Sequence, residues 1–204
     1  MNSRPTISPG LHGPLPIEVS EVSAPGSIGM LLLIATDAAV FVCLLASYFF
    51  LQAGSTTWPP DGIKKPDLGL ITINTFILWG SSIPIQWADS SIRKGHRGRL
   101  AIGFALAFGM ASLFLVLQGV EYTHKEFSPQ TDVYGSLFYT ITGFHGLHVL
   151  AAVIINGVIQ VRAWLGHFNQ QRHLAVRNAA IFWHFVDVIW VFVYASLYLS
   201  PYAF

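Results

Sequence analysis

Charged residues are scarce in this sequence. Only 10% of the 204 residues are Asp, Glu, Lys or Arg, and 53% are hydrophobic, whereas about 25% charged residues are usual in soluble domains. This composition indicates an integral membrane protein. Lys and Arg together number 11, against 10 for Asp and Glu, so the formal net charge is only +1. Because the chain lacks a basic surplus, we predict no nucleic-acid partner.

Cysteine is nearly absent as well. The single cysteine, Cys43, lies within an apolar run, so the chain can form neither a disulfide framework nor a metal site built on several cysteines. We interpret Cys43 as a small packing residue. The sequence also lacks an internal repeat. Only Pro84 hints at the broken helix that a small transporter would need, so a transporter is a weak alternative.

Five predominantly apolar stretches of about 20 residues are long enough to cross a hydrocarbon core of about 30 Å. Backbone hydrogen bonds cannot stay unmade in lipid, and barrel strands would be only about 9 to 11 residues long, so each stretch is predicted to be a helix. The predicted fold is therefore all-α, an integral membrane bundle of five transmembrane helices. Their expected ranges are about 28–51, 68–87, 100–120, 137–161 and 179–199.

The residues before the first helix differ in composition. Residues 1–26 contain five prolines and no apolar core, which is typical neither of a signal peptide nor of a folded domain. We predict an extended Pro/Gly-rich arm over residues 1–26 and a transmembrane domain over residues 27–204. The connections between helices are short, which favours antiparallel neighbours.

Basic residues in the connections predict the orientation of the bundle. The side that holds the amino-terminal arm carries eight of them, whereas the other side carries only Lys64, Lys65 and Lys125. By the positive-inside rule, the amino terminus is expected inside and the carboxyl terminus outside. The eight are Arg4, Arg93, Lys94, Arg97, Arg99, Arg162, Arg172 and Arg177.

Ionisable residues interrupt three of the apolar stretches near mid-membrane. Asp37 lies in the first predicted helix, His145 and His148 in the fourth, and His184 and Asp187 in the fifth. A charged side chain at a helix centre costs about 2.5 to 3.5 kcal/mol, so such residues face partners inside a bundle. We interpret the histidines and Asp187 as polar clamps between helices, with His184 beside Asp187. For Asp37 the partner must come from another helix, a lipid or another subunit, and a role in proton handling stays open beside a structural one.

Glu121 stands at the outer end of the third predicted helix, next to Tyr122 and close to Gln118. A carboxylate costs little at the membrane interface. We therefore interpret Glu121 as a polar clamp that anchors the helix end or the adjoining loop.

Opposing histidines from two helices could hold a haem in geometric terms. His145 and His148, however, alternate with Gly143 and Gly146, and small residues bring helices too close together for a macrocycle. We predict that the chain itself binds no metal and no haem. A membrane cytochrome stays as an alternative.

Four ordered motifs resemble subunit III of the haem-copper respiratory oxidases. They are WPPDGI at 58–63, LQGVEY at 117–122, VYGSLFYTITGFHGLHV at 133–149 and FWHFVDVIWVFVYASLY at 182–198. Together they extend over nearly the whole predicted bundle. Members of this family commonly have seven helices, and this sequence is similar to the shorter class with five.

The resemblance implies a subunit without a catalytic centre, in a complex whose haems and copper belong to partner subunits. The main partner would be subunit I, with subunit II and a small subunit IV as further partners, and phospholipids would bind between helices. A role in sustaining proton uptake is implied for Asp37, which stands where the family often has a glutamate. Arg162 matches a family arginine associated with lipid phosphate, and Trp183 is assigned to lipid binding as well.

The resemblance leaves the electron donor of the complex open. Quinol oxidases and a relative associated with nitric oxide reductases share the core motifs, and a purely structural assembly subunit is a further alternative. A bacterial-type cell membrane is the expected location, ahead of an organellar inner membrane.

Overall fold

The computed structural model describes residues 25–60 and 62–203. Most of the predicted amino-terminal arm, residues 1–24, lies outside the described residues. The first helix already begins at Pro25, within the range that the sequence assigned to the arm. Proline is favoured at the first position of a helix, because the N–H that it lacks would have no partner there.

Five long helices make up the fold. They are α1 (Pro25–Ala53), α2 (Leu68–Arg93), α3 (Arg97–Thr123), α4 (Val133–Trp164) and α5 (Leu174–Tyr194), and α5 continues through a π-helical segment, η1 (Ala195–Leu199), into the short α6 (Ser200–Ala203). All five are long and apolar enough to cross a membrane. The part of the chain that the structure describes contains no strand. The predicted all-α fold with five spanning helices is confirmed, whereas the inside and outside positions of the termini stay a prediction.

Polar side chains cap the amino-terminal ends of α2 and α4, outside their apolar stretches. The side chain of Asp67 accepts a hydrogen bond from the N–H of Gly69 at 2.9 Å, and that of Asp132 accepts one from Gly135 at 2.7 Å. Such bonds satisfy N–H groups that have no partner within the helix. The cap at Asp132 explains why α4 begins at Val133, four residues before the range that hydropathy predicted.

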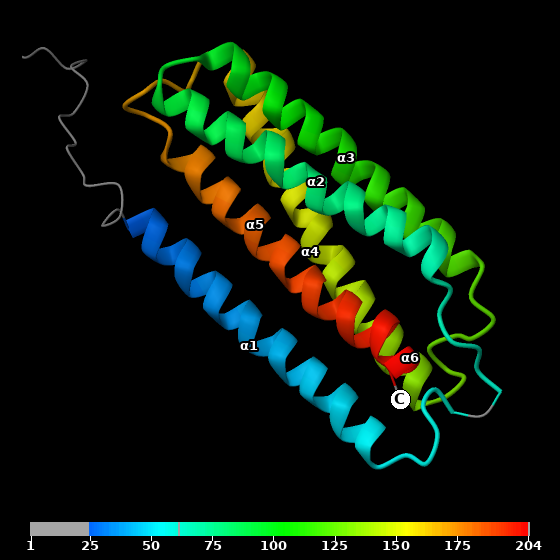
Figure 1. Ribbon diagram of the computed structural model, residues 1–204. Helices are drawn as coiled ribbons and strands as arrows, with labels where there is room; N and C mark the ends of the chain where they lie inside the picture. Colours follow the sequence, from blue (N-terminus) through cyan, green and yellow to red (C-terminus); the bar gives the residue numbers. More distant parts are fainter. Residues whose placement is uncertain (1–24, 61, 204) are drawn as a thin grey trace, which may run out of the picture.

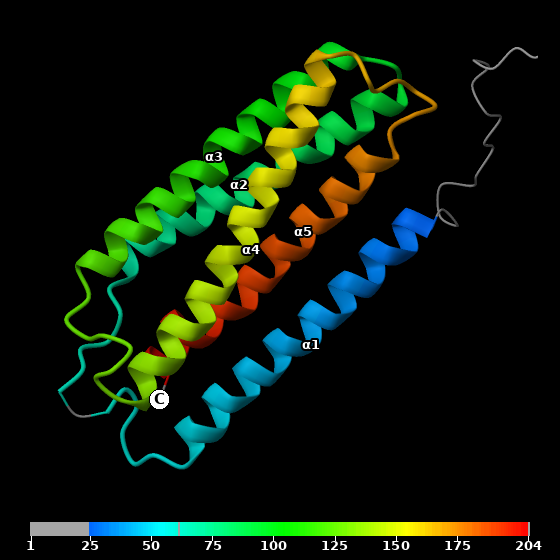
Figure 2. The same ribbon diagram turned by 180° about the vertical axis from the view of Figure 1, so that it is seen from behind.

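Four of the helices close into a bundle. Contacts join α2 with α3 and α5, and α4 with α3 and α5. In Figure 1, α5 lies between α1 and α2, and Figure 2 shows α3 and α4 on the opposite side of the molecule. α1 packs on the outside of this bundle, mainly against α5 and α4. Its position therefore depends on few contacts.

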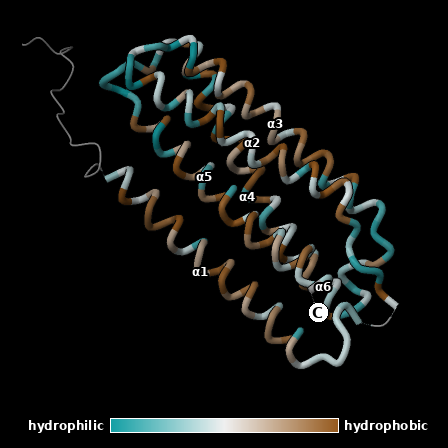
Figure 3. The backbone as a smooth tube through the Cα atoms, viewed as in Figure 1, coloured by the Kyte–Doolittle hydropathy of each residue, from teal (hydrophilic) through white to brown (hydrophobic). Residues whose placement is uncertain are grey.

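The outer surface of the helices is apolar. Figure 3 shows hydrophobic residues along the helices and hydrophilic ones gathered at both ends. Among the 29 residues of α1, only Ser27, Phe41 and Tyr48 are buried. A surface of this kind is stable against acyl chains and would be unstable in water.

α3 approaches α2 closely at Gly103. Gly103 of α3 faces the carbonyl oxygen of Pro84, and a Cβ added at Gly103 would lie 2.5 Å from this oxygen and 2.7 Å from Ala88 Cβ. Both distances are too short for real atoms. Only glycine fits at this position, because a side chain would push α3 away from the proline-containing segment of α2.

We predict that Gly103→Ala destabilises the chain by about 1 to 3 kcal/mol, the usual cost of inserting atoms into a packed core. The measurement is the unfolding free energy of the purified chain in detergent. Gly109→Ala on the same helix is the matched control, because its Cβ would meet no atom within 4 Å. Equal stability of the two variants would contradict the close packing of α3 on α2.

Candidate functional site

Asp37 and His148 meet between α1 and α4. Each lies near the midpoint of its helix, and the Asp37 Oδ2 to His148 Nε2 distance is 3.4 Å. The side chains are 24% and 13% exposed, respectively, so the pair lies at the surface of the bundle. The rings of Phe41 and Phe144 pack on the imidazole, with centroid distances of 5.2 and 4.6 Å. The partner of Asp37 thus comes from another helix, one of the three sources that the sequence left open.

A hydrogen bond within α4 sets the orientation of the His148 ring. His148 Nδ1 lies 2.8 Å from the carbonyl oxygen of Phe144, and a carbonyl oxygen only accepts, so Nδ1 carries a hydrogen. His148 Nε2 is then the ring nitrogen that faces the carboxyl group of Asp37, 3.4 Å from Oδ2. The pair thus places a carboxyl oxygen beside an imidazole nitrogen.

A second cluster joins α5 to α2. Ser82 Oγ of α2 lies 3.0 Å from His184 Nδ1 and makes a short hydrogen bond to Asp187 Oδ2. His184 Nε2 donates to Gln86 Oε1 at 3.2 Å. The sequence placed His184 beside Asp187 one helical turn apart, and the structure inserts the hydroxyl of Ser82 between them. Ser82 and Gln86 were missed, although their four-residue spacing places both on one face of a helix.

This cluster also shares a single proton. Ser82 has one hydroxyl hydrogen, and both its neighbours lie at hydrogen-bond distance. Either Ser82 donates to the Asp187 carboxylate and accepts from an imidazolium, or a protonated Asp187 donates to Ser82, which then donates to neutral His184. His184 Nε2 carries a hydrogen in both arrangements, and the net charge of the cluster is zero.

His145 is a packing residue in this structure. Its side chain is buried and stacks on Trp190, with ring centroids 4.6 Å apart, and the ring of Phe114 lies edge-on at 6.1 Å. Neither ring nitrogen has a hydrogen-bond partner among the described residues. His145, His148 and His184 therefore occupy three separate environments, and within residues 25–60 and 62–203 no three His, Cys, Asp or Glu side chains gather as metal ligands would.

Glu121 lies at the opposite end of the bundle from the α2–α3 turn. It lies near the end of α3, its side chain is buried, and its Oε2 accepts hydrogen bonds from Gln118 at 3.0 Å and Tyr198 at 3.1 Å. Lys125 Nζ lies 2.7 Å from Oε1 and 5.1 Å above the ring centre of Phe138. The sequence counted Lys125 only as a loop charge, but one helical turn separates it from Glu121, which brings the two charges together.

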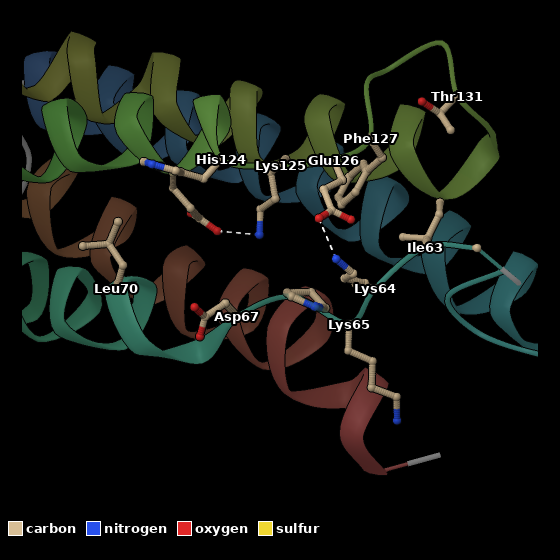
Figure 4. Close-up of a pocket in the computed structure, with 13 residues that line it drawn as sticks. Ile63, Lys64, Lys65, Asp67, Leu70, His124, Lys125, Glu126, Phe127 and Thr131 are labelled. Carbon is tan, nitrogen blue, oxygen red and sulfur yellow. Dashed lines mark hydrogen bonds and ion pairs between the residues drawn. The ribbon is translucent and has the colours of Figure 1, made fainter.

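The Glu121–Lys125 pair borders a cavity of about 420 Å³. Figure 4 shows Lys125 pointing into this cavity and the pair Lys64–Glu126 on one side of it. Lys64 Nζ and Glu126 Oε1 are 2.6 Å apart, and both side chains are exposed. The walls of the cavity therefore carry paired charges of both signs.

Asp89 is a further buried acid, which the predicted range 68–87 left outside the second helix. It pairs with Arg93, four residues later in α2. Polar residues at the end of a spanning helix lower its hydropathy, and hydropathy alone consequently ended the helix too early.

The two residues assigned to lipid binding have different surroundings. Arg162 is exposed near the end of α4, with its guanidinium 5.0 Å from the ring centre of Phe168. Trp183 is buried, and its indole N–H donates to Ser81 Oγ at 2.9 Å. The position of Trp183 inside the bundle gives no support to a lipid contact, because both its ring and its polar atom face protein.

Comparison with known proteins places these helices in a family. Residues 18–202 match the family described as cytochrome c oxidase subunit III. The chain is 37% identical to cytochrome c oxidase subunit 3 of Thermostichus vulcanus over 173 residues, which cover 84% of this chain and 86% of the relative. The subunit 3 of a Synechocystis species is 33% identical, with coverages of 84% and 74%, and that of Gallus gallus is 36% identical, with coverages of 83% and 67%. The chain therefore belongs to the cytochrome c oxidase subunit III family.

Proposed function

We propose that this chain is the subunit III of a proton-pumping haem-copper terminal oxidase and that it has no redox centre of its own. It binds subunit I and membrane lipids, stabilises the complex and supports proton uptake. The family match over residues 18–202 supports the assignment to such a complex. The haems and copper lie in the partner subunits. The separate environments of His145, His148 and His184 favour this division, because each ring faces a contact other than a second imidazole.

The proposed role in proton handling rests on the Asp37–His148 pair. It combines a carboxylate and an imidazole at 3.4 Å, near the middle of two helices and partly exposed at the bundle surface. Intramembrane ionisable groups that are held in pairs are typical of proton-handling sites. We propose that a proton taken up by the pair is shared between Asp37 Oδ2 and His148 Nε2, so that little charge moves when the proton is accepted or released.

Because α1 lies on the outside of the bundle, lipids or subunits that surround it can come close to the Asp37–His148 pair. α1 packs against α4 and α5 with one face, and most of its residues are exposed. Lipids or subunit I that cover this helix would therefore adjoin Asp37 directly. We propose that the pair, with lipids near it, keeps the proton supply of subunit I active over many turnovers. Arg162, exposed at the end of α4, is the proposed contact for a lipid phosphate.

We predict that Asp37→Ala leaves the initial turnover of the purified oxidase within a factor of about 5, which corresponds to about 1 kcal/mol of barrier. Activity is expected to decay faster during continuous turnover. Proton uptake is expected to fall at alkaline pH, because protons are scarce there and the loss of a proton-holding site slows uptake most. Oxygen consumption and proton uptake, followed over many turnovers, measure both effects.

Thr36→Ala is the matched control for Asp37→Ala, because Thr36 is adjacent and, among the residues that the structure describes, its hydroxyl bonds to backbone carbonyls of its own helix alone. His148→Phe should reproduce the effect of Asp37→Ala, since it removes the other half of the proton-holding pair. Activity that persists unchanged in the Asp37 variant over thousands of turnovers would refute the proton role.

The Ser82–His184–Asp187 cluster favours a second, structural function in assembly. It links α5 to α2 through three polar side chains. Removal of one member leaves polar groups of the others, which are buried (Asp187) or half-buried (Ser82 and His184), without a hydrogen bond. The cost is up to about 1 to 3 kcal/mol for each group. This subunit would then support the oxidase by presenting a fixed bundle to its partners.

Asp187→Leu is expected to lower the yield of assembled complex several-fold, with normal turnover in the complexes that do form. Yield is measured by copurification, and turnover is expressed per haem. Asp187→Asn retains an acceptor for Ser82 and should assemble better than the leucine variant, while Val188→Leu, at an exposed neighbouring position, should behave as wild type. A normal yield combined with lost turnover would show that the cluster acts in the chemistry and not in assembly.

Cytochrome c is the proposed electron donor of the complex, as the names of the relatives suggest; a quinol is the alternative. We expect the copurified complex to show a reduced-minus-oxidised haem spectrum and the isolated chain to show none. Oxidation of reduced cytochrome c, compared with that of a quinol, then identifies the donor. A haem spectrum in the isolated chain would overturn the division of cofactors among subunits.

A further inference from the structure

α1 packs on the other helices through one narrow strip of residues, which we name the α1 seam. Most residues of α1 that are not exposed recur at alternating intervals of three and four. This spacing places side chains on one face of a helix and is typical of helices that pack knobs into holes. Asp37 is the charged member of the seam. Its residues are Ser27, Met30, Ile34, Asp37, Phe41, Leu44, Tyr48 and Leu51.

Phe41 is the buried seam residue nearest to Asp37. It is 1% exposed, whereas its neighbours Val40 and Val42 are 44% and 65% exposed. Phe41 follows Asp37 by four residues, so the two side chains lie one helical turn apart on the same face. A contact that fixes the position of Phe41 therefore also fixes the position of Asp37.

The ring of Phe41 inserts into the surface of α4. Its centroid lies 5.0 Å from that of Phe144, 6.4 Å from that of His145 and 5.2 Å from that of His148. These three residues occupy positions i, i+1 and i+4 of α4, which lie around one hole on a helix surface. Phe41 is therefore the knob with which α1 enters α4, and one side of the hole is the imidazole that faces Asp37.

The imidazole of His148 is held from three helices. Phe144 of α4 and Phe182 of α5 also place their rings beside it, with centroid distances of 4.6 and 6.4 Å. Nδ1 lies 2.8 Å from the carbonyl oxygen of Phe144, and Nε2 lies 3.4 Å from Asp37 Oδ2. Of the three phenyl rings, only that of Phe41 belongs to the helix that carries Asp37.

The hydrogen bonds of α1 to the platform lie far from Asp37. Asn178 Nδ2 donates to the carbonyl oxygen of Gly26 at 3.1 Å, and the hydroxyls of Tyr48 and Ser200 lie 3.3 Å apart. Gly26 and Tyr48 are each eleven residues from Asp37, which is about 16 Å along the helix. Contacts at this distance hold the ends of α1, whereas the position of its middle depends on Phe41.

We propose that Phe41 is a positioning residue for the Asp37–His148 pair. Its ring keeps the imidazole turned with Nε2 toward Asp37, and it sets the separation of α1 from α4 at this level. Phe41 has no ionisable group and takes up no proton itself. This inference rests on the proposed function, in which the pair supports proton uptake.

A double-mutant cycle in the intact oxidase tests this role. Phe41→Leu removes the ring and keeps an apolar side chain. It should speed the decay of activity during continuous turnover to within about twofold of the rate seen with Asp37→Ala, which is the error of such comparisons. In the Asp37→Ala background, Phe41→Leu should add less than about twofold, because no pair is left to position. A residue that only stabilises the bundle would speed decay by the same factor in both backgrounds, and that result would overturn the proposal.

Phe50→Leu is the matched control, because it makes the same change on the same helix at a side chain that is 78% exposed and lies outside the α1 seam. It should decay as wild type does. Retention of the chain in the complex is measured per haem for every variant, and decay is compared among complexes that contain the chain. Phe41→Leu that lowers retention but leaves decay unchanged in these complexes would show a structural role and refute the positioning role.

The variants of the pair separate this inference from the function on which it rests. If Asp37→Ala and His148→Phe leave the decay of activity unchanged, the proton role fails and the positioning role fails with it. If both speed the decay and Phe41→Leu does not, only the positioning role of Phe41 is refuted.

Discussion

The hydrocarbon interior of a membrane offers no hydrogen-bond partner, and this constraint organises the polar residues of the bundle. Four acidic residues lie in the described helices, namely Asp37, Asp89, Glu121 and Asp187, and each has a basic residue nearby. The bases are His148, Arg93, Lys125 and His184, the last of which is reached through Ser82. Pairing of this kind leaves little net charge in the apolar slab, so the cost of inserting each helix falls well below that of isolated charges.

The same constraint explains which helices are held together most firmly. α5 contacts α2 through hydrogen bonds along much of its length, from the Ser82 cluster to Trp190 Nε1, which donates to Thr75 Oγ1 at 3.0 Å, and to Tyr194, whose hydroxyl lies 2.7 Å from that of Thr72. α1 meets α4 near its middle mainly through Asp37 and the ring of Phe41. The four helices α2, α3, α4 and α5 thus form a fixed platform, and α1, which packs on its outside, is the least restrained of the five long helices.

Sequence alone predicted the five helices and the depth of their ionisable residues, because hydropathy and a rise of 1.5 Å per residue suffice for both. It could not predict which helices are neighbours. Asp37 and His148 were each placed at mid-membrane, but only the packing of α1 on α4 pairs them. Ser82 and Gln86 were overlooked for a related reason: uncharged polar residues barely change hydropathy, and their importance becomes visible only when α5 presents His184 to them.

The four acid–base contacts differ in what they can do. Asp89–Arg93 and Glu121–Lys125 join residues one turn apart in the same helix, so a change in their protonation cannot by itself move one helix relative to another. Asp37–His148 and the Ser82 cluster join different helices, and each combines an imidazole with a carboxyl group. The Ser82 cluster lies within the firmly held platform. The Asp37–His148 contact instead joins α1 to the platform, beside the contacts of α1 with α5. It is therefore the acid–base pair that adjoins a lipid or subunit covering this helix.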